Sequence, residues 1–132
     1  MVLASARIIL SNPRLELLKP LEVEALADSG ANFLCISQHI AQELRLETMM
    51  DKEVATADGK RTLYPYVGPI RVRFENRGCY VGAIVMGNQV LLGAIPMEDM
   101  GLVVTPLERR VAVNPLHPDH AAGLAVGNVR PV

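Results

Sequence analysis

Apolar and polar residues alternate along several short stretches of this chain, and turn residues separate the stretches. In residues 21–27 apolar side chains occupy every second position, and residues 70–74 repeat the pattern. Alternation with a period of two predicts a strand with one buried face. Similar or wholly apolar runs predict further strands at residues 6–10, 15–27 (interrupted near Pro20), 33–36, 50–57, 62–67, 80–86, 90–92, 102–104 and 110–113.

Only two short stretches have helical character. Ser37 is a suitable N-cap for a helix over residues 38–44, whose apolar side chains recur with helical spacing. Pro96 suits the first turn of a second helix, which Gly101 should end. Many short strands with two short helices predict a mainly β fold, a small barrel or sandwich.

One pair of strands should form a projecting hairpin. Asp58-Gly59 lies between the extended runs at residues 50–57 and 62–67. An Asp-Gly pair in this position is among the strongest local signals for a hairpin turn. Asp58 is therefore expected to be a turn residue.

Composition narrows the classes of protein. The chain has 132 residues, 50% of them hydrophobic, which suits one domain with a real core. A net charge of -1 with no basic stripe argues against binding to nucleic acid or to an anionic membrane. No secretory signal or membrane span is evident, and Cys35 and Cys79 are expected to be reduced and buried, so we expect a cytoplasmic protein. Residues 114–132 lack periodicity and predict an irregular tail.

A carboxylate, a hydroxyl and a glycine follow one another where the alternating strand of residues 21–27 ends. The sequence there is Asp28-Ser29-Gly30. The strand delivers Asp28 to a point where the chain must turn, and Gly30 permits the turn because glycine adopts backbone angles closed to other residues. Asp28 is either a structural turn residue, as is common in loops, or a catalytic carboxylate.

Three motifs, in this order, resemble the retropepsin-like aspartic proteases, in particular the small cellular single-domain members. Asp28-Ser29-Gly30-Ala31 resembles the catalytic loop, Ala57-Asp58-Gly59 the flap hairpin, and Leu91-Leu92-Gly93 the apolar-apolar-glycine element that precedes a short helix. The resemblance implies a small closed acid-protease barrel with one or two short helices. Residues 1–113 would form this domain, and residues 114–132 would lie outside it.

The resemblance implies an aspartic endopeptidase that works as a homodimer. Relatives of this length supply one aspartate per chain, so two copies of Asp28 would hold the water that attacks a peptide bond. A peptide or protein would be the substrate, and neither a cofactor nor a metal would be needed.

The remaining motif residues take supporting roles by the same resemblance. Support of the catalytic loop would fall to Ser29, Gly30 and Ala31. The flap residues that would cover the cleft are Ala57, Asp58, Gly59 and Lys60. Packing behind the catalytic loop would fall to Leu91, Leu92 and Gly93.

Two alternatives stay open beside the protease. Ala94 and Thr105 depart from the residues usual in relatives, which favours an inactive module of the same fold that binds an extended peptide or protein partner. A metal site using His117 and His120, with Asp119 between them, is the weaker alternative, because the two histidines lack a third and fourth ligand and a rigid scaffold.

Overall fold

The alternating pattern of the first strands is seen directly in their burial. The structure is a computed structural model that describes residues 4–123. Strand β1 (Ala4–Ser11) buries every second residue and pairs antiparallel with β2 (Leu21–Ala27). Residues 12–20 form the connection, so the strand expected from residue 15 begins six positions later. The side chain of Asn12 organises this connection by donating to the carbonyl oxygen of Leu44 at 2.9 Å.

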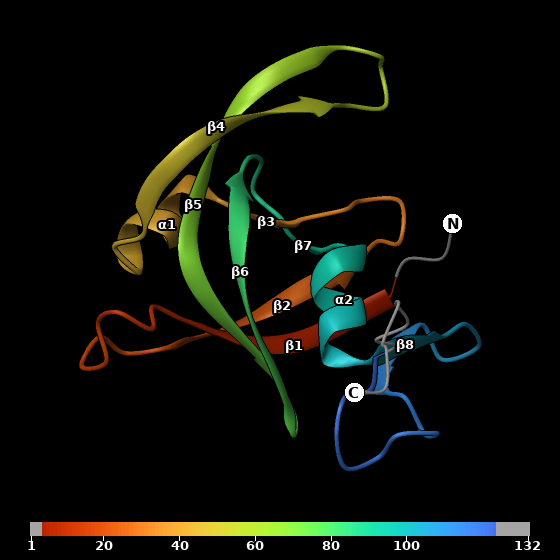
Figure 1. Cartoon of the computed structure of the whole chain (residues 1–132). Helices are drawn as coiled ribbons and strands as arrows, with labels where there is room; N and C mark the ends of the chain where they lie inside the picture. Colours follow the sequence, from red (N-terminus) through yellow and green to blue (C-terminus); the bar gives the residue numbers. More distant parts are fainter. Residues whose placement is uncertain (1–3, 124–132) are drawn as a thin grey trace, which may run out of the picture.

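Six strands close into a barrel. Besides β1 and β2 it contains β3 (Leu34–Ile36), β5 (Arg61–Phe74), β6 (Arg77–Val85) and β7 (Val90–Leu92). Neighbours around the ring follow the order β5-β6-β3-β7-β2-β1, and pairing of β1 with β5 closes it (Figure 1). The predicted fold class, mainly β with a small closed barrel and two short helices, is confirmed.

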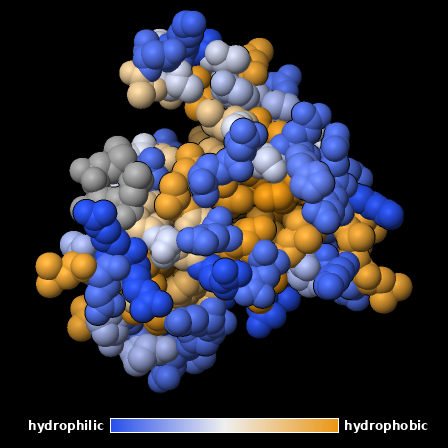
Figure 2. Space-filling model, turned by 180° about the vertical axis from the view of Figure 1, so that it is seen from behind, coloured by the Kyte–Doolittle hydropathy of each residue, from blue (hydrophilic) through white to orange (hydrophobic). Residues whose placement is uncertain are grey.

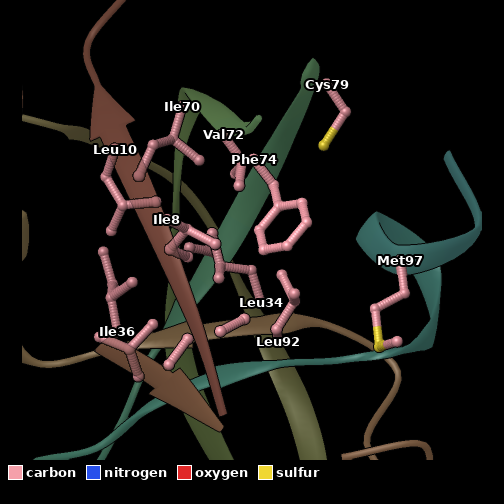
Figure 3. Packing of buried hydrophobic residues seen from close by; sticks show 14 of the residues in the cluster. Ile8, Leu10, Leu34, Ile36, Ile70, Val72, Phe74, Cys79, Leu92 and Met97 are labelled. Carbon is pink, nitrogen blue, oxygen red and sulfur yellow. The ribbon is translucent and has the colours of Figure 1, made fainter. Parts of the chain in front are cut away.

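The barrel encloses the core. Side chains from β1, β3, β5 and β7 point toward one another inside it (Figure 3), and the fully buried ones include Ile8, Leu10, Leu34, Ile36, Ile70, Val72 and Leu92. Each such side chain contributes about 1.5–3 kcal/mol when it leaves water. The core therefore holds the ends of β2 and β7 in place.

Both predicted helices exist, but the second begins earlier than expected. Helix α1 (Gln38–Glu43) is capped by Ser37, whose hydroxyl oxygen accepts from the amide of Ile40 at 3.2 Å. Helix α2 (Ala94–Met100) starts two residues before Pro96 and ends at Gly101, which has a φ of 65°. The earlier start has a tertiary cause, because carbonyls of the loop after β2 accept from the first amides of α2.

One hairpin extends beyond the barrel. Strand β4 (Glu47–Ala55) pairs with the first half of β5. The strands expected separately at residues 62–67 and 70–74 are one long strand, β5, with a register shift between Val67 and Ile70. Strands β8 (Leu102–Thr105) and β9 (Arg110–Val113) form a second antiparallel pair. In Figure 1 the β4–β5 hairpin arches above the barrel.

Residues 114–123 contain no helix or strand, and the remainder of the expected tail lies outside the described residues. They are nonetheless bonded to the barrel. The buried guanidinium of Arg77 donates to the carbonyl oxygens of Met100 and His117, and the side chain of Asn76 donates to the carbonyl oxygen of Pro118 at 3.0 Å.

Within residues 4–123, no helix combines the length and the apolar character needed to cross a membrane. The same part of the chain contains no group of three or more His, Cys, Asp and Glu side chains arranged to hold a metal ion.

Candidate active site

Asp28 lies immediately after β2, where a carbonyl of β7 holds its backbone. The two strands are parallel neighbours with Ala27 opposite Leu92, and the Asp28 amide donates to the Leu92 carbonyl oxygen at 3.0 Å. The Asp28 carboxylate accepts from the Gly30 amide at 2.9 Å, and the Asp28 carbonyl accepts from the Ala31 amide at 3.0 Å. The half-buried carboxylate is therefore oriented by its own loop.

Gly93 lets this loop lie directly on the start of α2. A Cβ atom at Gly93 would lie 2.4 Å from the Phe33 carbonyl oxygen, closer than any side chain allows. The amides of Ala94 and Ile95 donate to the loop carbonyls of Ala31 and Asn32 at 2.8 and 2.9 Å. The structure thus brings the two predicted elements, Asp28 to Ala31 and Leu91 to Gly93, into direct contact.

Within the loop, Ser29 and Gly30 are exposed and Ala31 is half-buried. The Ser29 hydroxyl makes no hydrogen bond to any residue of the range 4–123. It is available to a second molecule.

The predicted flap residues form the tip of the β4–β5 hairpin. The Thr56 amide donates to the Lys60 carbonyl oxygen at 3.0 Å, and Gly59 takes a φ of 84° that favours glycine. The Asp58 carboxylate accepts from the Thr56 hydroxyl and, at 3.1 Å, from the Lys60 amide, and these hydrogen bonds lower its pKa. Asp58 acts as the turn residue that its sequence context predicts, and Ala57 is exposed beside it.

The hairpin covers a hollow on the molecular surface. In Figure 1 its tip extends to the same side of the barrel as the loop joining β2 and β3. Figure 2, which views the molecule from behind, shows the surface hollowed beneath the hairpin. Asp28 and the flap therefore belong to one end of the barrel.

Cys35 lies close enough to Asp28 for its titration to be affected. Burial, and secondarily the negative charge of Asp28, raises the pKa of the Cys35 thiol. Both Cys35 and Cys79 are free and buried, as predicted. A neutral buried thiol is a poor nucleophile.

A cationic and aromatic cluster beside the loop was not predicted. The ammonium of Lys52 on β4 lies 4.8 Å from the Phe33 ring centroid and 4.4 Å from that of Tyr66. The two rings meet edge to face with centroids 6.1 Å apart. Phe33 was expected in a strand, but that strand begins at Leu34 and Phe33 belongs to the loop. The one hint in the sequence is the position of Lys52 within β4, where it falls on the half-buried face of the strand.

Comparison with known proteins adds no assignment, since no protein-family model and no curated protein matches this chain.

Proposed function

We propose that this protein is a retropepsin-like aspartic endopeptidase, with a shared site formed by Asp28 from each chain of a homodimer. The observation that carries the proposal is the fixed position of Asp28. Its amide is bonded to the Leu92 carbonyl at 3.0 Å, its carboxylate is held by the Gly30 amide, and it lies at the end of the barrel that the hairpin covers.

The chemistry follows from placing two such carboxylates together. Like charges at close range cannot both ionise cheaply, so one carboxyl keeps its proton and the pair titrates as a unit. The ionised member would take a proton from a bound water, which attacks the peptide carbonyl, while the protonated member donates to the carbonyl oxygen. The exposed Ser29 hydroxyl would bond across the two-fold axis to the partner's loop.

The hairpin would supply the cover and part of the substrate grip. Strand β4 is an edge of the sheet within the described residues, so its outward backbone groups can pair with an extended peptide. Closure of the tip, residues 56–60, over the peptide would exclude water from the site.

The same edge strand supports a second candidate, an inactive module that binds an extended peptide or protein partner through β4. Such a module would need neither a homodimer nor an ionised pair. The helix after Gly93 starts with Ala94, whose amide donates to the Ala31 carbonyl oxygen at 2.8 Å and whose methyl side chain cannot form a hydrogen bond to the loop.

Cleavage of a degenerate peptide library, with light scattering of the same samples, distinguishes the two candidates. The protease proposal expects a dimer whose cleavage is abolished in Asp28→Asn, and Asp119→Asn, at an exposed position in the segment after β9, serves as the matched control. A monomer, or a dimer that cleaves nothing, favours the binding module. Activity that persists in Asp28→Asn contradicts the protease.

We also propose a cytoplasmic location, since both cysteines are free and buried as expected for a reducing compartment. Cell fractionation that recovers the protein only with secreted or membrane material contradicts this.

A further inference from the structure

A groove with exposed apolar side chains follows β6 and is separate from Asp28. Its first hollow, about 350 Å³, is lined by residues that include Phe33, Met49, Tyr66, Tyr80, Ile95 and Pro96. A second hollow, about 290 Å³, is lined by residues that include Leu15, Leu18, Pro20, Arg71 and Tyr80. Because Tyr80 lines both, we call these two hollows together the Tyr80 groove. Asp28 lines neither of them.

Large side chains in this groove face solvent instead of the core. Tyr80 is 64% exposed, Ile95 48% and Met49 44%. They come from β6, α2 and β4, so the fold gathers them from distant parts of the chain. Exposed apolar side chains that gather in one hollow indicate a surface that another molecule covers.

The walls of the first hollow are already in place. A Cβ atom at Gly82 would lie 2.1 Å from the Tyr66 ring, so this glycine on β6 leaves the space that the ring occupies. Phe33 then packs edge to face against Tyr66. A preformed wall lowers the entropy cost of binding.

Two cations flank the groove, and Glu16, in the second hollow, is the one acidic side chain among the residues that line the two hollows. The ammonium of Lys52 lies over Phe33 and Tyr66, and the guanidinium of Arg71 lies 6.0 Å from the Tyr80 ring centroid. Among residues 4–123, Arg7, Arg14 and Arg61 each pair with a glutamate. In that range neither Lys52 nor Arg71 forms an ion pair.

We propose that the Tyr80 groove binds an extended segment of a partner protein in which apolar residues are flanked by Asp or Glu. The apolar side chains would cover Met49, Tyr80 and Ile95, and the carboxylates would pair with Lys52 and Arg71. Charge complementarity selects this occupant over a basic or neutral segment. The proposal does not depend on catalysis, because the groove excludes Asp28.

The test measures fluorescence anisotropy of short labelled peptides in which a pair of leucines is flanked by glutamates. All measurements use the Asp28→Asn variant, so that the peptides are not hydrolysed by the proposed protease. The binding result therefore stands even if the protease proposal fails. Peptides that carry glutamine in place of glutamate should bind about threefold to tenfold more weakly, as expected for the loss of partly exposed ion pairs. Lysine should weaken binding further, and added salt should weaken only the glutamate peptide.

Variants locate the binding surface. Lys52→Met and Arg71→Gln should each reduce the preference for glutamate over glutamine. Arg73→Gln, on the same strand as Arg71 but lining a different hollow, should preserve it. Tyr80→Ser, at an exposed position that tolerates substitution, should weaken both peptides about threefold or more.

Three results would overturn the proposal. One is absence of saturable binding by every peptide, and another is equal affinity for glutamate and lysine peptides. The third is that Tyr80→Ser changes the oligomeric state, measured by light scattering, but leaves the peptide affinity unchanged. That result would assign the groove to a second copy of this chain.

Discussion

The backbone amide of Asp28 donates to the carbonyl oxygen of Leu92 at 3.0 Å. This hydrogen bond holds the candidate catalytic loop against β7, which lies between β2 and β3 in the sheet. Gly93 follows that carbonyl and lies beneath Phe33. The orientation of Asp28 therefore depends on Gly93, a position outside the Asp28 loop.

Gly93→Ala should displace the loop and destabilise the protein. The added methyl would lie 2.4 Å from the Phe33 carbonyl oxygen and 2.6 Å from the Asn32 carbonyl carbon. These are backbone atoms that cannot rotate away, so we expect a loss of about 1–3 kcal/mol, typical of overpacking. Chemical denaturation measures the loss, and amide exchange at Ala31 and Ile95 reports the displacement.

Gly78→Ala is the matched control for that prediction. A Cβ atom there meets its nearest neighbour, the Val72 carbonyl oxygen, at 3.4 Å, an ordinary contact distance. Its effect should stay within about 0.5 kcal/mol. Equal destabilisation by both variants would assign the effect to loss of glycine in general.

Acid should loosen the hairpin tip. Hydrogen bonds from the Thr56 hydroxyl and the Lys60 amide hold the pKa of Asp58 below its ordinary value of 3.8. A lowered pKa contributes to the order of the tip above pH 3.8, and this contribution is lost as the pH falls through the folded pKa. Titration by NMR should show the Asp58 pKa rising in Thr56→Val, while Thr62→Val on the returning strand leaves it unchanged.

Local chemistry explains which elements the sequence could predict. Alternation placed β2 so that it ends immediately before Asp28, the Ser37 cap defined the start of α1, and Asp58-Gly59 defined the hairpin tip. Each of these signals lies within a few residues of the structure it specifies. The strand and turn that carry Asp28 were therefore predictable.

Contacts between distant residues explain what was missed. The start of α2 at Ala94 depends on carbonyls of Ala31 and Asn32, and the connection over residues 12–20 depends on Asn12 reaching Leu44. The cluster of Lys52 with Phe33 and Tyr66 likewise joins three separate segments. No local pattern encodes such contacts, because the fold alone brings these segments together.

Alkali should destabilise the folded chain through Cys79. Burial, with a smaller effect of the Asp99 charge, raises the pKa of this thiol from 9.0 to about 12. Between these values the unfolded thiol loses its proton and the folded one keeps it, so stability falls as the pH rises from 9.0 toward 12. Urea denaturation across this range should give a shallower decline for Cys79→Ala than for the wild-type chain. Identical slopes would contradict the prediction.

Arg77 is a buried cation whose side-chain hydrogen bonds go to backbone carbonyl oxygens. Its side chain is 4% exposed and donates to the Met100 carbonyl oxygen at 3.0 Å and to the His117 carbonyl oxygen. Its Nε atom is buried with no hydrogen-bond partner among residues 4–123. The guanidinium therefore links the end of α2 to the segment after β9 at some cost in desolvation.

Arg77→Lys should destabilise the protein more than Arg77→Met. Lysine keeps the buried charge but lacks the fork that reaches both carbonyls, whereas methionine removes the charge and its desolvation cost. Loss of a hydrogen bond to a charged group predicts about 1.5–3 kcal/mol for Arg77→Lys. Chemical denaturation measures this, and limited proteolysis should cut residues 114–123 faster in both variants. Arg73→Lys, at an exposed position on β5, should change neither quantity. If Arg77→Lys proved as stable as the wild-type chain, the two carbonyl bonds would not be what holds the segment after β9.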